Sequence, residues 1–346
     1  MNSQALKADL LMFIAAVIWG FAFVAQRQGM ETMGPFLFNG VRFLIGVVAL
    51  SPVVWFLSKK PQKTHKAEVS TKKLIFAGTA AGLLLFGAIS FQQVGLQYTT
   101  AGKAGFITGL YIFFVPLIGL FFGQKTGSGT WLGATIALVG LYLLSIKEDF
   151  SIAEGDLLQL VCAVFFAAHV LYIGYFAKRM DPLKLSLVQY VVTGVLSLLI
   201  AIIVELITWD MIKHTAIPLL YAGVMSTGIA YTLQVVAQQH AHSSHAAIIL
   251  SLEGAFAVLG GWLLLDEYLT TRGLLGCGLM LTGMFFSQLF PKLGSSLKRR
   301  IVKVEPLVET SLPSVMTIRE PSISVASRSG SAMEICLPQR CAIRMM

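Results

Sequence analysis

Long apolar stretches separated by short polar segments dominate the chain from residue 10 to residue 291. A helix of roughly 20 apolar residues crosses the hydrocarbon core of a membrane. In the first half, the stretches of this size are Leu10–Gln26, Thr32–Ser58, Leu74–Gly102, Ala104–Gln124 and Thr126–Ile146. In the second half, they are Leu157–Ala177, Leu185–Val204, Thr215–Gln239, Ala246–Leu265 and Gly273–Pro291. The pattern predicts an all-α integral membrane protein with ten transmembrane helices.

Composition supports this prediction and excludes several other classes of protein. Of 346 residues, 56% are apolar and 12% are charged, against about 25% charged in soluble domains. The connections between the stretches are too short for a soluble catalytic domain. Four cysteines without a CxxC pair give no support to a disulfide scaffold or a zinc site. The net charge of +9 comes from Lys and Arg between the apolar stretches, which indicates membrane topology and not nucleic-acid binding.

The distribution of Lys and Arg also predicts the orientation. If the N-terminus is cytoplasmic, 15 Lys and Arg residues fall in inner segments and 5 in outer loops. Cytoplasmic segments carry the excess of these residues, so both termini are expected in the cytoplasm. The membrane is expected to be the bacterial plasma (inner) membrane. A cleaved signal peptide is the alternative for the first stretch. Only Lys7 precedes that stretch as a basic residue, and a small-x-small cleavage pattern is missing.

The two halves of the chain resemble each other. Residues 8–146 and 157–291 match at nearly constant offsets: Pro35 with Pro182 at 147, Gln92 with Gln234 at 142, and Gly133 with Gly276 at 143. Each half holds five spans, and a unit with an odd number of spans enters the membrane from opposite sides in its two copies. The chain is therefore predicted to be two inverted five-helix repeats, an arrangement typical of secondary transporters with a site near mid-membrane.

Particular motifs resemble a known family. They are Trp19-Gly20, the stretch from Pro35 to Arg42, and the run Leu252-Glu253-Gly254 through Gly260-Gly261-Trp262 to Asp266-Glu267. They are similar to the EamA family of the drug/metabolite transporter superfamily, over about residues 8–290. The resemblance implies ten helices, cytoplasmic termini and export of amino acids or related small metabolites. Gly254 departs from the family, which often has Pro there, and Gln124-Lys125 replaces the acidic end of span four.

Three ionisable residues lie within the apolar stretches and are candidate functional residues. Glu253 has to pair, face water or hold a proton, and at an offset of 142 it corresponds to Tyr111. Arg42 can bind a substrate carboxylate bidentately, or it can form an ion pair or capping contact that fixes helix packing. His169 can relay protons, or it can be a hydrogen-bonded packing residue.

Amide and aromatic side chains are further candidates for a pathway used by a polar substrate and its coupling ion. They come from spans one, three and eight and are Trp19, Gln93, Gln97, Tyr98, Tyr231 and Gln234. The alternative for the amides is hydrogen bonding between helices, which contributes about 0.6 kcal/mol per pair in membranes.

Other features limit the energy source and the partners. A phosphate-binding GxxxxGK[ST] loop is missing, so ATP is not expected to drive transport. Hydrolytic and metal-binding motifs are missing too, and no cofactor or metal is expected. Glycine ridges in span four, Gly105 with Gly109 and Gly119 with Gly123, let helices approach closely within the chain or in a homodimer. The tail at residues 295–346 is rich in Ser and Pro and is predicted to be disordered and cytoplasmic.

The sequence as a whole favours a secondary transporter, either ion-coupled or facilitated, that exports small metabolites by alternating access, and a proton is the candidate coupling ion. Two alternatives remain, a non-transporting membrane scaffold and an intramembrane enzyme. An enzyme would need a catalytic dyad or metal ligands at mid-depth.

Overall fold

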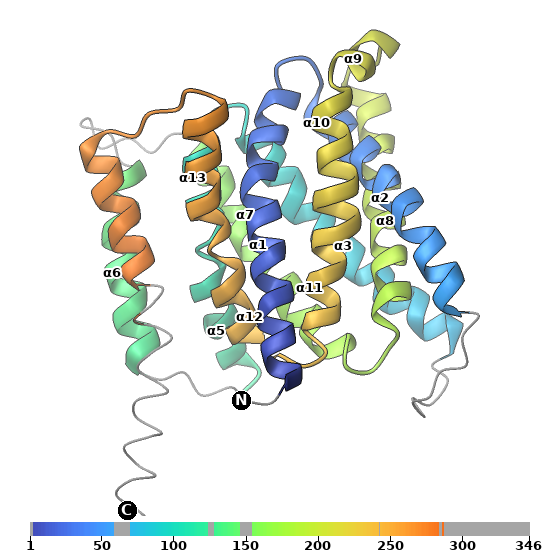
Figure 1. The fold of residues 1–346 in the computed structure, drawn as a ribbon, viewed down its shortest axis with the longest axis horizontal. Helices are drawn as coiled ribbons and strands as arrows, with labels where there is room; N and C mark the ends of the chain where they lie inside the picture. Colours follow the sequence, from blue (N-terminus) through green and yellow to red (C-terminus); the bar gives the residue numbers. More distant parts are fainter. Residues whose placement is uncertain are drawn as a thin grey trace, which may run out of the picture. The chain divides into compact units, whose positions relative to one another are not determined.

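The computed structural model describes residues 3–58, 70–123, 128–145, 154–241, 243–283 and 286. All regular structure within these residues is helical (Figure 1). The chain divides into two units, residues 1–297 and 298–346. The second unit, like the predicted tail from residue 295 and most of the basic connection at 59–73, lies outside the described residues.

The first half holds six helices. They are α1 (Ser3–Gly29), α2 (Pro35–Ser58), α3 (Thr71–Gly95), α4 (Ala101–Thr108), α5 (Tyr111–Phe121) and α6 (Ser128–Ser145). The second half holds α7 (Glu154–Phe176), α8 (Pro182–Val204), α9 (Trp209–His214), α10 (Ala216–Leu220), η1 (Tyr221–Tyr231), α11 (Thr232–Ala237), α12 (Ser243–Leu250) and α13 (Glu253–Leu264). A last helix covers residues 271–283.

Eight helical segments in the described residues are long and apolar enough to cross a membrane. They correspond to α1, α2, α3, α4 with α5, α7, α8, α10 with η1 and α11, and α12 with α13. Their outward side chains are apolar: Val48 is 71% exposed, Phe76 74% and Ile203 80%. Such a surface is stable against lipid and not against water. The molecule is therefore a multi-pass helical membrane protein.

The packing of the helices relates the two halves. Helix α2 packs on α8, and α4 packs on α13, so equivalent spans of the two halves meet. The other contacts occur in corresponding pairs. Helix α3 packs on α7 as α1 packs on η1, and α3 packs on α8 as η1 packs on α2. The last helix approaches α6 closely, since a Cβ added at Gly140 would lie 2.5 Å from the carbonyl oxygen of Gly276.

Two carboxylates show that the equivalent spans run antiparallel. Glu205, the residue after α8, accepts hydrogen bonds from the backbone N–H groups of Phe36 (2.8 Å) and Leu37 (2.7 Å) at the start of α2. Glu267, which follows α13, accepts from Ala101 (2.9 Å) and Gly102 (3.2 Å) at the start of α4. In both pairs, the end of a helix from the second half meets the beginning of its equivalent from the first half. We call these contacts the two carboxylate clamps, Glu205 on α2 and Glu267 on α4.

Two spans are interrupted at equivalent positions. Span four breaks between Thr108 and Tyr111, and span nine breaks between Leu250 and Glu253. Each break is a tight turn whose backbone bonds are of the i→i+3 type, such as Leu110 N–H to the Ile107 oxygen. The backbone keeps right-handed helical dihedral angles through both turns, so each is a short 3₁₀ segment within one long span, a feature that often marks a functional hinge or strain. As a result, Tyr111 and Glu253 each begin the second half of a broken span.

Span eight contains an unusual segment of its own. Its central eleven residues, Tyr221–Tyr231, form a π-helix between α10 and α11. Long π-helices are rare, and π segments frequently occur at functional sites. The hydroxyl of Thr227 donates to the Ala222 carbonyl at 2.9 Å within this segment.

One glycine ridge packs helices within the chain. A Cβ at Gly105 would lie 2.5 Å from the Cβ of Ala257 on α13 and 3.3 Å from the Cα of Gly254. Residue 105 has to be small because α4 and α13 approach closely there. This part of the ridge therefore serves contact between the two halves.

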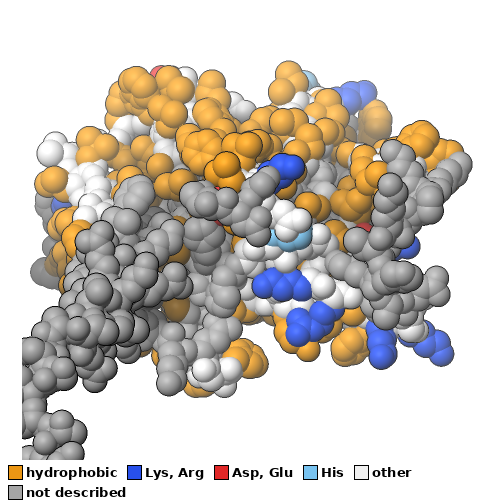
Figure 2. All heavy atoms as spheres, turned by 60° about the horizontal axis from the view of Figure 1, so that its bottom comes forward, with side chains coloured by type: hydrophobic (Ala, Val, Ile, Leu, Met, Phe, Trp, Pro, Cys, Tyr) orange, Lys and Arg blue, Asp and Glu red, His pale blue; other side chains and the backbone are white. Residues whose placement is uncertain are grey.

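Basic side chains gather on the face at which α1 begins (Figure 2). The helix ends that reach this face carry Lys72 and Lys73 at the start of α3, and Lys178, Arg179 and Lys184 between α7 and α8. An excess of Lys and Arg is typical of the cytoplasmic face. The orientation itself remains a prediction from the sequence.

Candidate functional site

A cavity lies among the helices of both halves, with a volume of about 400 Å³ that includes its open side. Its lining residues are Trp19, Phe23, Gln26, Arg42, Gln92, Tyr111, Phe166, Val170, Ser226, Tyr231, Gln234, Leu250 and Glu253. Small-molecule sites are concave and place a few polar groups on mostly apolar walls, and the lining of this space has that character. We call this space the central cavity.

Much of the lining is paired between the halves. Trp19 with Phe166, and Phe23 with Val170, lie 147 positions apart in the chain. Gln92 with Gln234, and Tyr111 with Glu253, lie 142 positions apart. These are the offsets of the sequence repeat, so equivalent residues of the two halves face one common space.

Arg42 occupies an unusual environment. It is the seventh residue after Pro35 in α2 and is 1% exposed. Its Nε and Nη2 atoms are buried without a hydrogen-bond partner within the residues that the structure describes. The guanidinium carbon lies 5.2 Å from the ring centroid of Phe43 and 5.8 Å from that of Phe38. Aromatic faces attract a cation, but they do not satisfy its N–H donors.

Glu253 is the acidic group of the cavity. It is 5% exposed and is the first residue of α13, after the break in span nine. The ion pairs that involve the described residues are Lys103 with Asp156 at 3.8 Å and Lys213 with Asp210 at 3.4 Å. Neither Arg42 nor Glu253 belongs to an ion pair within this part of the chain. A buried charge without a partner is costly, which marks both residues as candidates for binding.

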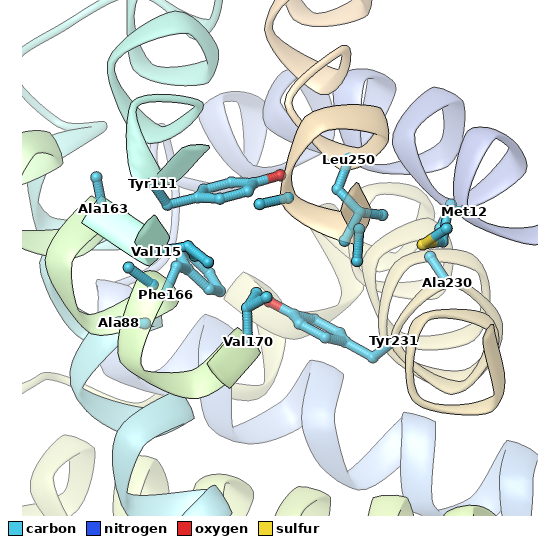
Figure 3. Packing of buried hydrophobic residues seen from close by; sticks show 14 of the residues in the cluster. Met12, Ala88, Tyr111, Val115, Ala163, Phe166, Val170, Ala230, Tyr231 and Leu250 are labelled. Atoms are coloured by element: carbon cyan, nitrogen blue, oxygen red, sulfur yellow. The ribbon is translucent and has the colours of Figure 1, made fainter. Parts of the chain in front are cut away.

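Aromatic rings form the walls of the central cavity. The ring centroids of Trp19 and Tyr231 lie 4.6 Å apart, and those of Tyr111 and Phe166 lie 6.4 Å apart. The hydroxyls of Tyr111 and Tyr231 point into the same space from opposite sides, with Val170 beside it (Figure 3). The Tyr111 hydroxyl lies beside the carboxyl group of Glu253, its equivalent in the second half.

Contacts hold the π-helix and the amides in place. Trp19 Nε1 donates to the backbone oxygen of Ser226 in the π-helix at 3.3 Å. Gln26 Nε2 donates to the Ala22 carbonyl at 3.1 Å, while its Oε1 atom, like Oε1 of Gln234, lacks a partner within the described residues. The cavity thus offers a cation, a carboxyl group, phenol hydroxyls and amide oxygens to a bound molecule.

Six of the ten sequence-predicted residues line this cavity. They are Trp19, Arg42, Tyr111, Tyr231, Gln234 and Glu253.

The other four predicted residues lie elsewhere. His169 is fully buried and shares a hydrogen bond of 2.9 Å with the Oε1 atom of Gln189, between α7 and α8. Gln93 is buried, and its amide donates to the backbone oxygen of Gln26 at 3.3 Å. Gln97 and Tyr98 are exposed beyond the end of α3.

The sequence interpretation missed seven lining residues, which are Phe23, Gln26, Gln92, Phe166, Val170, Ser226 and Leu250. The repeat offset could have found some of them. At the repeat offsets, Trp19 corresponds to Phe166, and Gln234 corresponds to Gln92. Apolar residues such as Leu250 carry no signal of their own in an apolar span.

The fold and the cavity together define a class: a multi-pass membrane protein in which two related halves surround one buried polar space. The family model of EamA-like transporters matches residues 6–146 and 153–289. The chain belongs to this family, within the drug/metabolite transporter superfamily. It is a member of a transporter family and not an enzyme.

Relatives in several organisms support this assignment. An uncharacterized transporter of Archaeoglobus fulgidus is 34% identical over 83% of this chain and 87% of its own. The uncharacterized transporter YoaV of Bacillus subtilis is 26% identical over 81% and 96% of the two chains. A probable amino-acid metabolite efflux pump of Escherichia coli is 25% identical over 81% and 94%. A crystal structure with 20% identity shares the fold with a TM-score of 0.62, covering 82% of this chain and 96% of that one.

Proposed function

We propose that this protein is a secondary transporter that exports amino acids or related small metabolites across the plasma membrane by alternating access. The observation that carries the proposal is the central cavity, which both halves line with equivalent residues at the level of the broken spans. Transporter sites lie at the interface of repeats and are built from discontinuous helices. The efflux function named for the Escherichia coli relative is consistent with it.

We further propose ten helices in two inverted repeats. Eight candidate spans, helix α6 and the helix at residues 271–283 add up to this number. The antiparallel packing of α2 on α8 and of α4 on α13 supports the inversion. Helices related by an axis in the membrane plane run in opposite directions where they meet.

The coupling ion in this proposal is a proton, carried by Glu253. A carboxyl group that moves between a buried and a hydrated environment takes up and releases a proton. In this proposal the basic face of Figure 2 is the cytoplasmic face and both termini are cytoplasmic, as the excess of Lys and Arg suggests. A non-transporting scaffold is the second candidate, but buried ionisable groups around a cavity are costly and give a scaffold no advantage.

The experiment compares metabolites released by cells that overexpress the protein with those released by a deletion strain. Ser226→Phe should fill the cavity, because Ser226 lines it and is 1% exposed. We expect this variant to reach the membrane and to lose export. Val48→Phe, on the 71% exposed face of α2, is the matched control and should keep it. Equal release from all strains, at equal expression, would contradict the proposal.

A further inference from the structure

The two halves of the central cavity match in shape but differ in charge. The pairs Trp19 with Phe166 and Gln92 with Gln234 keep the same kind of group on both sides. Arg42 has Gln189 at the equivalent position, 147 residues further on, and Glu253 has Tyr111. The paired lining residues of the two halves require neither of these charged groups. We therefore consider Arg42 and Glu253 as the residues that select a particular ligand.

Gln189, the residue equivalent to Arg42 in the second half, has a structural role. Its Oε1 atom is 2.9 Å from the ring Nε2 of His169, so it joins α8 to α7. Gln189 Nε2 and His169 Nδ1 are also buried without a partner within the described residues, but this pair keeps one hydrogen bond, whereas Nε and Nη2 of Arg42 have none there. A guanidinium that fixed helix packing would use these two donors on the neighbouring helix.

The unpaired Nε and Nη2 donors of Arg42 indicate which chemical group of a ligand this residue can bind. Nε and Nη2 form one edge of the planar guanidinium, which matches the two oxygens of a carboxylate. The same cavity holds Glu253, which in its ionised form would repel a dianion such as a phosphate monoester more strongly than a monoanion. Arg42, Tyr231 and Trp19 line the same cavity, so a monoanion at Arg42 would also meet the aromatic pair of Tyr231 and Trp19.

We propose that Arg42 is a carboxylate-binding subsite and that the substrate is a small monocarboxylate, with or without an amino group. The inference rests on the proposed transport function and adds the residue that orients the substrate. The carboxylate binds the Nε and Nη2 edge, and the rest of the molecule lies against the aromatic walls formed by Trp19, Tyr231 and Phe166.

The first test separates this role from a structural one. Arg42→Gln places in the first half the residue that the second half already has. Since it removes a buried, unpaired charge, the ligand-free variant should melt a few degrees higher than the natural protein, in purified full-length form in detergent. Arg179→Gln makes the same change at an exposed position at the end of α7 and should leave the melting temperature unchanged. A lower melting temperature for Arg42→Gln, with Arg179→Gln unchanged, would show that Arg42 supports the fold and would overturn the proposal.

The second test uses three probes of nearly one shape: 3-phenylpropionate, L-phenylalanine and L-phenylalaninamide. Ligands that bind the folded state raise its melting temperature. We expect the two carboxylates to stabilise the natural protein and the amide to have no effect. In Arg42→Gln the affinity should fall roughly tenfold or more, as for the loss of charge-assisted hydrogen bonds, and Arg42→Lys should restore part of it. Stabilisation by the amide, equal stabilisation of Arg42→Gln, or no response to any probe up to its solubility limit would overturn the proposal.

Flux measurements keep this inference distinguishable from the proposed function. Proteoliposomes are loaded with L-phenylalanine or its amide, and counterflow of the labelled probe is followed. Carboxylates that bind through Arg42 without any flux would support the subsite and contradict transport. Flux of the amide that equals that of L-phenylalanine, unchanged by Arg42→Gln, would support transport and contradict the subsite.

Discussion

At the scale of single residues, two buried ionisable groups, Glu253 and His169, differ in their surroundings. Glu253 lines the cavity, has no ion pair within the described residues and starts the second half of a broken span. His169 is equally buried but is engaged with Gln189, away from the cavity lining. Both can carry a proton, but the cavity exposes only Glu253 of the two to a substrate or to water entering with it.

Glu253→Gln should uncouple transport from the proton. The amide keeps the size and hydrogen-bonding capacity of the carboxyl group but does not titrate between pH 5 and 8. We expect a folded protein that exchanges substrate across proteoliposome membranes and no longer responds to an imposed pH gradient. Glu31→Gln, an exposed change in the loop after α1, serves as the control. An unchanged pH profile in Glu253→Gln would place coupling elsewhere.

His169→Ala should affect stability and not coupling. The substitution leaves the Gln189 amide unpaired between α7 and α8 and opens a small void. The free energy of unfolding should fall by about 1–3 kcal/mol, seen as a lower melting temperature. Transport by the folded fraction should keep its dependence on pH. The control is His214→Ala, at an exposed site on α9. A pH profile that shifts in His169→Ala alone would instead assign this residue to a proton pathway.

At the scale of elements, the apolar stretches predicted where the spans lie but not how they are interrupted. Both breaks lie inside long apolar stretches, and single polar residues such as Thr108, Ser251 and Glu253 do not interrupt the average hydropathy of those stretches. The π-helix of span eight has no hydropathy signal either, since it differs from an α-helix in its hydrogen bonds and not in its composition. Sequence periodicity therefore located Glu253 in a span but not at a helix start, and it missed Ser226.

The two carboxylate clamps connect helices in the same way. Both tie the second half to helix starts of the first half, and carboxylates at helix N-termini are favoured by the unpaired N–H groups and the helix dipole. According to the predicted topology, both lie on the outer side, at the starts of α2 and α4. Opening the cavity to this side requires these contacts to separate.

Removing the clamps should make the cavity more accessible from the outside. We expect Glu205→Ala with Glu267→Ala to increase the labelling rate of a cysteine at position 226 by an impermeant thiol reagent in intact cells. The background lacks the four native cysteines. Asp210→Ala is the matched control, because Asp210 is exposed on the same side and pairs with Lys213 at 3.4 Å. An unchanged labelling rate would show that the clamps stabilise the fold without controlling access.

At the scale of the whole molecule, the orientation depends on the basic face. Cysteines introduced at Lys178, between α7 and α8, should be shielded from an impermeant reagent in intact cells. Cysteines at Lys213, on α9, should react. The reason is that Lys and Arg are retained on the cytoplasmic side during insertion. Permeabilised cells, in which both positions should react, provide the control, and the opposite pattern would reverse the orientation.

If the protein works by the proposed alternating access, the clamps also influence which state it occupies at rest. In an inverted repeat, the two end states are related by exchanging the conformations of the halves, so identical halves would give states of equal free energy. A preference arises only from positions at which the halves differ. Ser58 and Lys125 stand at the repeat offsets from Glu205 and Glu267, and neither can provide a carboxylate.

In that cycle, this difference would bias the population of the two end states. If each clamp contributed roughly 1.4 kcal/mol, which corresponds to a tenfold change in an equilibrium constant, the pair would favour the state closed on their side about a hundredfold. Two acidic residues would then give a nearly symmetric molecule a preferred resting state. A substrate that drives the opposite opening has to supply a comparable difference in binding free energy between the two states.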